Sequence, residues 1–183
     1  MINELTVHAV ASNNKAKGVC TCTMVSAAII TAICPFTEKY RAILGVLIIT
    51  LISVGILMYT KYLAVRYMYD VTYDANGLAV FVVRSRTGKR ESTLLRVDLY
   101  AIISIKRLTA AELKTHKCDT GMVKYNYCPT LAPESAVLLK VQSHYERCEV
   151  LIEVTDEFIE YLTAITATAR EEYNRTEALT DEE

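Results

Sequence analysis

Five histidine and cysteine side chains belong to the residue types that bind zinc: His116, Cys118, Cys128, His144 and Cys148. Zinc ligands usually come in close pairs such as CxxC or HxxxH, and neither pair occurs among them. At best His116, Cys118 and one of His144 or Cys148 converge, because the predicted strands pull the others apart. The sequence therefore predicts no metal site and no cofactor, and the three cysteines of this set, at irregular spacing, suit reduced thiols.

Catalytic motifs are the next candidates, and the segment 86–92 comes nearest to a phosphate-binding loop. It contains the pair Gly88-Lys89, but the upstream glycine of such a loop is missing and no serine or threonine follows the lysine directly. GxSxG and HExxH motifs are absent from the sequence. The acidic residues are better explained as turn, edge and cap residues than as a paired acid and base. The sequence thus predicts a protein that is not an enzyme.

Charge is distributed unevenly along the chain. Residues 66–117 hold ten lysines and arginines against five acidic residues, whereas residues 118–183 hold five against fourteen. Near an anionic membrane each such cation contributes about 1 kcal/mol of attraction, so a basic hairpin predicts a site for lipid headgroups or a partner. The alternative is a solvated turn that keeps a sheet edge soluble. The predicted site residues are Arg84, Arg86, Lys89 and Arg90.

Two uncharged stretches near the N-terminus carry the strongest structural signal. Residues 18–37 and 42–60 contain no charged side chain and are separated by four residues. As α-helices they would be about 28 to 30 Å long, which matches the hydrocarbon thickness of a bilayer. The pattern predicts a transmembrane helical hairpin over 18–65, with spans at about 18–37 and 42–62. The lipid bilayer is thus a predicted partner, and the anchor together with the acidic second half argues against nucleic acid.

The flanking charges predict how this hairpin is oriented. Four lysines and arginines flank its two ends, against Lys39 and Arg41 in the turn. Because cytoplasmic loops carry the excess of positive charge, we expect a two-pass protein of the cell membrane with both termini in the cytoplasm. A cleaved signal peptide is disfavoured because a second span follows closely. A pair of buried core helices is disfavoured because little sequence remains to enclose them.

After residue 65 the chain changes to short β-like runs divided by turn signals. Asn76-Gly77 supplies the two positive-φ residues of a type I′ hairpin, and a second turn falls at 86–89. A polar connection at 109–121 separates the fourth strand from the fifth, and whether residues 5–11 add a strand stays open. The seven predicted strands are 68–75, 78–85, 91–97, 102–108, 122–127, 136–143 and 148–154.

A helix is predicted to close the domain. Thr155 is a suitable N-cap, and acidic residues follow it in the first turn. Phe158, Tyr161, Leu162, Ile165 and Ala169 recur at helical spacing, which is typical of a helix that covers a sheet sandwich. The expected organisation is an N-terminal segment 1–17, the hairpin 18–65, a β domain with C-terminal helix 66–175 and an acidic tail 176–183.

Three runs carry a family resemblance: the residues from Tyr69 to Leu78, the triplet Gly88-Lys89-Arg90, and the residues from Val97 to Ile105. With seven antiparallel strands and one amphipathic helix, residues 62–175 resemble bacterial pleckstrin-homology-like (PH-like) domains carried on two-helix membrane anchors. The resemblance implies a membrane-anchored α+β protein: a transmembrane hairpin, then a seven-stranded antiparallel sandwich or partly open barrel capped by the helix. It implies no enzymatic activity and carries no catalytic residues across.

Three functions follow from these patterns. The leading one is a non-enzymatic interaction module, which binds anionic lipid headgroups or a membrane-protein partner through the basic hairpin or an exposed strand edge. The second is a structural subunit whose hairpin packs in a larger membrane complex through Gly45 and Gly55. The third is a thiol or metal sensor that uses Cys118 and its neighbours.

Overall fold

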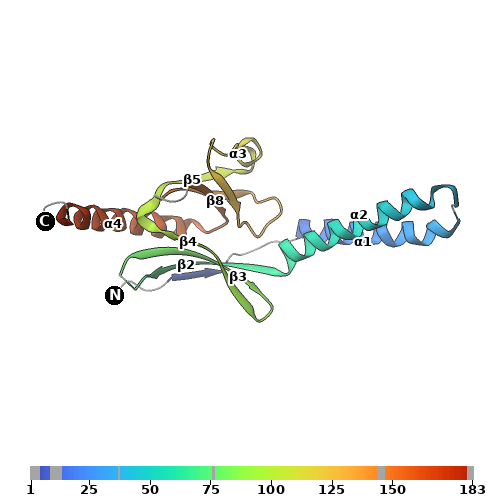
Figure 1. Cartoon of the computed structure of the whole chain (residues 1–183), viewed down its shortest axis with the longest axis horizontal. Coiled ribbons are helices and arrows are strands. Elements are labelled where there is room, and N and C mark those ends of the chain that lie inside the picture. Colours follow the sequence, from blue (N-terminus) through green and yellow to red (C-terminus); the bar gives the residue numbers. More distant parts are fainter. Residues whose placement is uncertain (1–4, 9–13, 37, 76, 144–146, 181–183) are drawn as a thin grey trace. The chain divides into compact units, whose positions relative to one another are not determined.

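The computed structural model describes residues 5–8, 14–36, 38–75, 77–143 and 147–180, and these divide into two compact units (Figure 1). One unit is helical and comprises Ala11–Arg66 together with Pro129–Leu131. The other is built from two sheets and a helix, and comprises Met1–Val10, Tyr67–Cys128 and Ala132–Glu183.

The helical unit is a pair of long apolar helices. α1 (Asn14–Ile33) leads through the 3-10 turns η1 (Cys34–Phe36) and η2 (Glu38–Tyr40) into α2 (Arg41–Met58), which ends in the π-helical turn η3 (Tyr59–Leu63). Two segments of 23 residues each, Asn14–Phe36 and Arg41–Leu63, are long and apolar enough to cross a membrane, by length and composition. The first helix starts at Asn14, four residues before the predicted span.

Small side chains let the two helices approach each other. Gly55 of α2 is buried, and a Cβ atom there would lie 3.2 Å from Thr23 Oγ1 and 3.3 Å from Met24 Sδ. The Cys20 thiol donates to the Gly55 carbonyl at 3.7 Å. Gly55 is therefore part of the contact between α1 and α2, whereas a Cβ atom at Gly45 would meet nothing within 4 Å.

The first sheet consists of β1 (Leu5–His8), β2 (Val65–Tyr73), β3 (Ala79–Thr87) and β4 (Arg90–Asp98), in that order. β1 runs antiparallel to β2, with Leu5 opposite Val71 and His8 opposite Met68. The N-terminal segment therefore adds an edge strand, which answers the question that the sequence left open.

The turn between β2 and β3 lies where the sequence predicted it. The Asp74 N–H donates to the Leu78 carbonyl, and the Gly77 N–H donates to the Asp74 carbonyl. Gly77 has φ +78°, a left-handed conformation that glycine adopts without strain. The predicted type I′ turn also rests on Asn76, which lies outside the described residues.

The second sheet has the order β5-β7-β8-β6, with β5 Ile102–Thr109, β7 Ser135–Gln142, β8 Arg147–Ile152 and β6 Val123–Asn126. All seven predicted strands exist, with ends within three residues of those expected. The prediction of a wholly antiparallel sheet is wrong, since β6 pairs in parallel with β8. Two chain reversals leave β6 and β8 pointing the same way, and β8 lies between β7 and β6. The two sheets form no closed barrel among the described strands.

The C-terminal helix covers the sheets as predicted. α4 (Asp156–Thr180) buries Phe158, Leu162, Ile165 and Ala169. It continues beyond 175, so residues 176–180 of the predicted acidic tail are helical, and 181–183 lie outside the described residues. Tyr100 of the short turn η4 (Leu99–Ala101) stacks on Tyr173 of α4 with ring centroids 4.1 Å apart.

A buried tyrosine joins the two sheets. Tyr69 of β2 is fully buried, and its hydroxyl donates to the Tyr127 carbonyl at 2.9 Å and accepts from the Glu153 N–H at 3.4 Å. Burial, opposed by the Glu153 hydrogen bond, raises the pKa of this phenol well above its ordinary value. The hydroxyl therefore stays protonated and fixes one sheet against the other.

Candidate functional site

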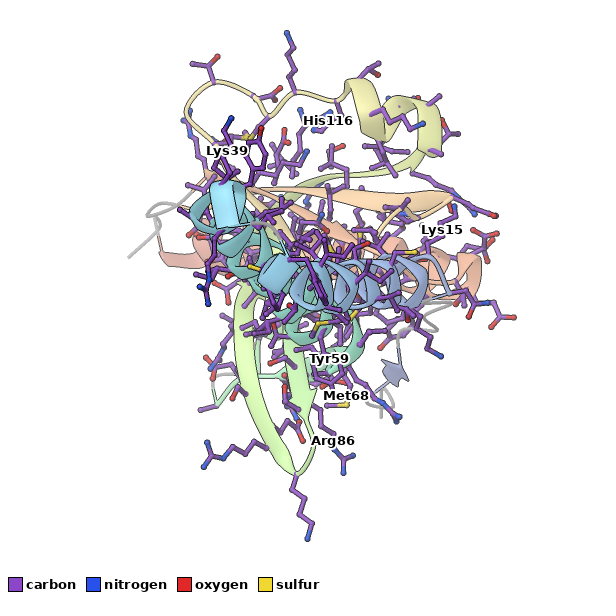
Figure 2. All side chains as sticks on the ribbon, turned by 90° about the vertical axis from the view of Figure 1, so that its right-hand side faces the viewer. Lys15, Lys39, Tyr59, Met68, Arg86 and His116 are labelled. Atoms are coloured by element: carbon purple, nitrogen blue, oxygen red, sulfur yellow. The ribbon has the colours of Figure 1, made fainter. Side chains whose placement is uncertain are left out.

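The four predicted site residues all lie on the hairpin of β3 and β4. Thr87 pairs with Arg90, which leaves Gly88 and Lys89 as a two-residue turn. Gly88 has φ +61°, and a glycine with positive φ at the first turn position is the mark of a type II′ hairpin. The end of this hairpin, which carries Arg86, extends away from the sheets (Figure 2).

The strand register divides the four cations between the two faces of the hairpin. Arg84 and Arg86 are two residues apart on β3 and share a face with Glu91, which is the partner of Arg86 in the register. Arg90 pairs with Thr87, so its side chain belongs to the opposite face. Lys89 lies in the turn itself. The cations therefore diverge from the hairpin and do not converge on one point.

Arg84 is held by two acidic side chains. Its Nε lies 3.3 Å from Asp70 Oδ2, and its Nη1 lies 3.3 Å from Glu91 Oε1. Asp70 is buried on β2, with only 4% of the residue exposed. The carboxylates of Asp70 and Glu91 thus offset the charges of Arg84 and Arg86 on this face. Arg84 therefore stabilises the sheet by neutralising Asp70 and is not part of the exposed end of the hairpin.

The remaining basic residues form an exposed group that we call the tip, defined by Arg86, Lys89 and Arg90. All three are exposed. Arg86 Nε donates to the Gly88 carbonyl at 3.3 Å, which directs its guanidinium along the turn. Because these three cations point in different directions, the tip suits a broad anionic surface better than a single polyphosphate group, whose recognition needs donors that converge.

The fold brings His116 and Cys118 to one carboxylate, that of Glu149, and separates Cys128 and Cys148 from them. Cys128 is buried in a small apolar cluster with Leu108, Leu138 and Leu151. Cys148 precedes Glu149 on β8, so the two side chains lie on opposite faces of the sheet. His144 lies outside the described residues. Within the described ranges, no three His, Cys, Asp or Glu side chains are placed to hold a metal ion.

His116 instead meets an acidic residue that sequence reasoning missed. Its Nε2 lies 2.7 Å from Oε2 of Glu149, which is fully buried. The Asp119 N–H donates to Glu149 Oε1 at 3.4 Å, and Lys140 Nζ lies 3.7 Å from the same oxygen. The available signal was an acidic residue inside the apolar strand 148–152, since a carboxylate in such a position requires partners.

The thiols of Cys118, near Glu149, and of Cys128, in the apolar cluster, are not activated as nucleophiles. Burial, and then the charge of Glu149, raise the pKa of Cys118, whose thiol donates to the Met122 carbonyl at 3.2 Å. Burial, and then Glu153, raise the pKa of Cys128 to about 12. A protonated thiol is a poor nucleophile and a poor metal ligand. The geometry thus gives little support to a thiol sensor at either cysteine.

Fold and site together define a class: an apolar helical hairpin joined to a mixed two-sheet unit with a C-terminal helix and a basic hairpin tip. Comparison with protein families, with curated proteins and with solved structures finds no match to this chain.

Proposed function

We propose that this chain is a non-enzymatic integral membrane protein, in which the helical hairpin is the anchor and the sheet unit is a cytoplasmic PH-like interaction module of a bacterial type. The tip contacts anionic lipid headgroups. The observation that carries the proposal is the exposure of Arg86, Lys89 and Arg90 at the end of a hairpin whose fourth cation, Arg84, is already paired.

The surface of the helical unit supports the anchor. Large apolar side chains remain exposed along α2, among them Ile43 at 68% and Ile49 at 67%. Several hydroxyls in the helices bond to their own backbone, as Thr50 does to Val46 and Ser53 to Ile49. Such hydroxyls need no water, so these helices suit a hydrocarbon environment.

The pairing of β1 with β2 supports a two-pass topology. β1 precedes the first helix and β2 follows the second, with only Ala64 between η3 and β2. Strands that share a sheet must lie on the same side of a bilayer, so two crossings fit this pairing and one crossing does not. Lys15, Lys17, Lys61 and Arg66 flank that side and favour the cytoplasm by the positive-inside rule.

The expected strength of the attraction between the tip and an anionic membrane follows from the number of its cations. Three cations near an anionic surface contribute about 3 kcal/mol, which corresponds to a change of about 100-fold in the docked population. Added salt weakens this attraction, because charges farther apart than about 10 Å are screened at ordinary ionic strength.

A single tryptophan tests the contact, because the chain contains none. Thr87→Trp places the probe beside the turn, in the full chain reconstituted into nanodiscs with spin-labelled headgroups. We expect quenching of its fluorescence to increase when phosphatidylglycerol is added to phosphatidylcholine, and the increase to disappear when Arg86, Lys89 and Arg90 are changed to Gln. Equal quenching in both lipids would contradict the proposal.

The matched control removes the same amount of charge elsewhere. Lys114, Lys117 and Lys124 are exposed cations of the sheet unit outside the hairpin, and changing all three to Gln should leave the quenching unchanged. If both triple variants lose quenching equally, net charge and not the tip determines the docking.

A second candidate, a subunit of a larger membrane complex, is favoured by Gly45. The space around its Cα leaves room for another helix to approach, whereas Gly55 is already used within the hairpin.

A further inference from the structure

Between β5 and β7 the chain forms a short helix, a loop and the edge strand β6, and we call residues 110–126 the strap. It begins with α3 (Ala110–Thr115), where Thr109 and Glu112 form a capping box, so the polar connection 109–121 is partly helical. It ends with β6, which pairs with β8. Leu113 packs on the apolar cluster of Leu108, Cys128 and Leu138.

One end of the strap is held by polar contacts. Glu149 projects from β8 and receives the His116 ring and the Asp119 N–H, both from the strap. Lys140 on β7 lies 2.5 Å from Asp119 Oδ2 and 3.7 Å from Glu149 Oε1. A turn closed by the Met122 N–H and the Asp119 carbonyl, with Gly121 at φ +85°, gives the loop its shape.

The contacts between the strap and the rest of the sheet unit are of two kinds, which differ in their dependence on charge. The apolar packing under α3 and the hydrogen bonds between β6 and β8 do not depend on the charge of any side chain. The contacts at Glu149 depend on the negative charge of its carboxylate. A fully buried carboxylate is stable only while its donors are in place, and the donors here come mainly from the strap. Charge at this one position therefore decides whether the loop 116–122 stays on the sheet.

We propose that Glu149, His116, Asp119 and Lys140 form a proton-operated latch, and that the loop 116–122 opens when Glu149 loses its negative charge. This device is independent of the tip and of lipid binding.

The groups that face Glu149 set the direction of its response. His116, Cys118 and Asp119 face it from the strap and Lys140 from β7, while Lys124 of β6 faces Cys118. Burial raises the pKa of Glu149, but the His116 and Asp119 donors outweigh it and hold this pKa below the ordinary value of 4.5. The latch is therefore closed above about pH 4.5 and weakens as the pH falls through the lowered pKa of the folded state.

Hydrogen exchange on the full chain in nanodiscs tests the latch. We expect Glu149→Gln to speed exchange of the amides of 116–122 by at least about 10-fold, the range expected for loss of charge-assisted hydrogen bonds. Amides of β3 and β4 should not change. Glu134→Gln is the matched control, because it removes an exposed carboxylate outside the strap.

Acid gives a second measurement that needs no variant. After correction for intrinsic rates, wild-type amides of 116–122 should exchange progressively faster as the pH is lowered below about 4.5, and this increase should be absent in Glu149→Gln. Equal protection of 116–122 in Glu149→Gln and Glu134→Gln would overturn the proposal. Loss of protection throughout the chain would overturn it too, because the loop would then not open as a separate unit.

Discussion

Replacing Arg84 by glutamine separates the paired arginine of the hairpin from the exposed cations of the tip. Asp70 is buried, and its Oδ2 lies 3.3 Å from Arg84 Nε. The other carboxylate oxygen, Oδ1, has no hydrogen-bond partner in the part of the chain that the structure describes. Arg84 is thus the cation that neutralises Asp70, and Arg84→Gln leaves a buried carboxylate without a counter-charge.

The magnitude follows from how enclosed the pair is. Removing one partner of a fully buried ion pair costs about 3 to 5 kcal/mol. The Arg84 side chain is 37% exposed, so solvent screens part of the interaction, and we expect a loss of about 1.5 to 3 kcal/mol in the free energy of unfolding. Arg86→Gln is the matched control on the same face, and we expect it to stay within about 0.5 kcal/mol of wild type.

Urea unfolding of the full chain in micelles, monitored by the circular dichroism of its tyrosines, measures the free energy of unfolding of both variants. The double variant with Asp70→Asn tests the cause, because a neutral amide needs no counter-charge. In that background Arg84→Gln should cost less than it does alone, and the difference is the coupling between the two residues. The same loss in both backgrounds, or no loss in the single variant, would refute the assignment of Arg84 to Asp70.

Two further predictions concern packing and burial. Gly55→Leu should lower the stability of the helical hairpin by about 1 to 3 kcal/mol, because the new side chain meets Thr23 and Met24, while Gly45→Leu should have little effect. Thermal loss of helicity in micelles compares the two variants. Equal losses would contradict the contact of Gly55 with α1. Cys128, with a pKa of about 12, should resist iodoacetamide at about pH 8 until urea unfolds the chain; mass spectrometry of the labelled peptide checks this, and rapid labelling of the folded chain would show the thiol to be accessible.

Local patterns were sufficient to predict the two long helices, seven of the strands and the C-terminal helix, but not β1 or α3. The turn at Gly88 requires a residue that adopts positive φ without strain, and the sequence places glycine there. The stripe of Phe158, Leu162 and Ile165 has the spacing of one helix face, and those side chains are buried in α4. Such signals are local, because a turn or an amphipathic face is encoded within a few residues.

Pairing between distant strands was not predictable in the same way. The parallel pairing of β6 depends on β8 lying next to it, and nothing in residues 123–126 encodes that neighbour. The link between Arg84 and Asp70 depends equally on how β2 and β3 meet. The four cations that the sequence groups together therefore differ in their surroundings, since Arg84 is paired with a carboxylate that lies fourteen residues earlier in the chain.

The edge strand β1 bears on the membrane topology more directly than the charges do. The flanking lysines and arginines outnumber those in the turn by two, which is a small bias. β1, by contrast, hydrogen-bonds to β2 across both helices in the sequence, so the segment before the first helix and the sheet after the second must share one compartment. Cleavage after the first helix would remove β1 and expose the Met68–Val71 edge of β2. If the two helices cross a membrane as proposed, a chain that keeps this strand crosses it an even number of times.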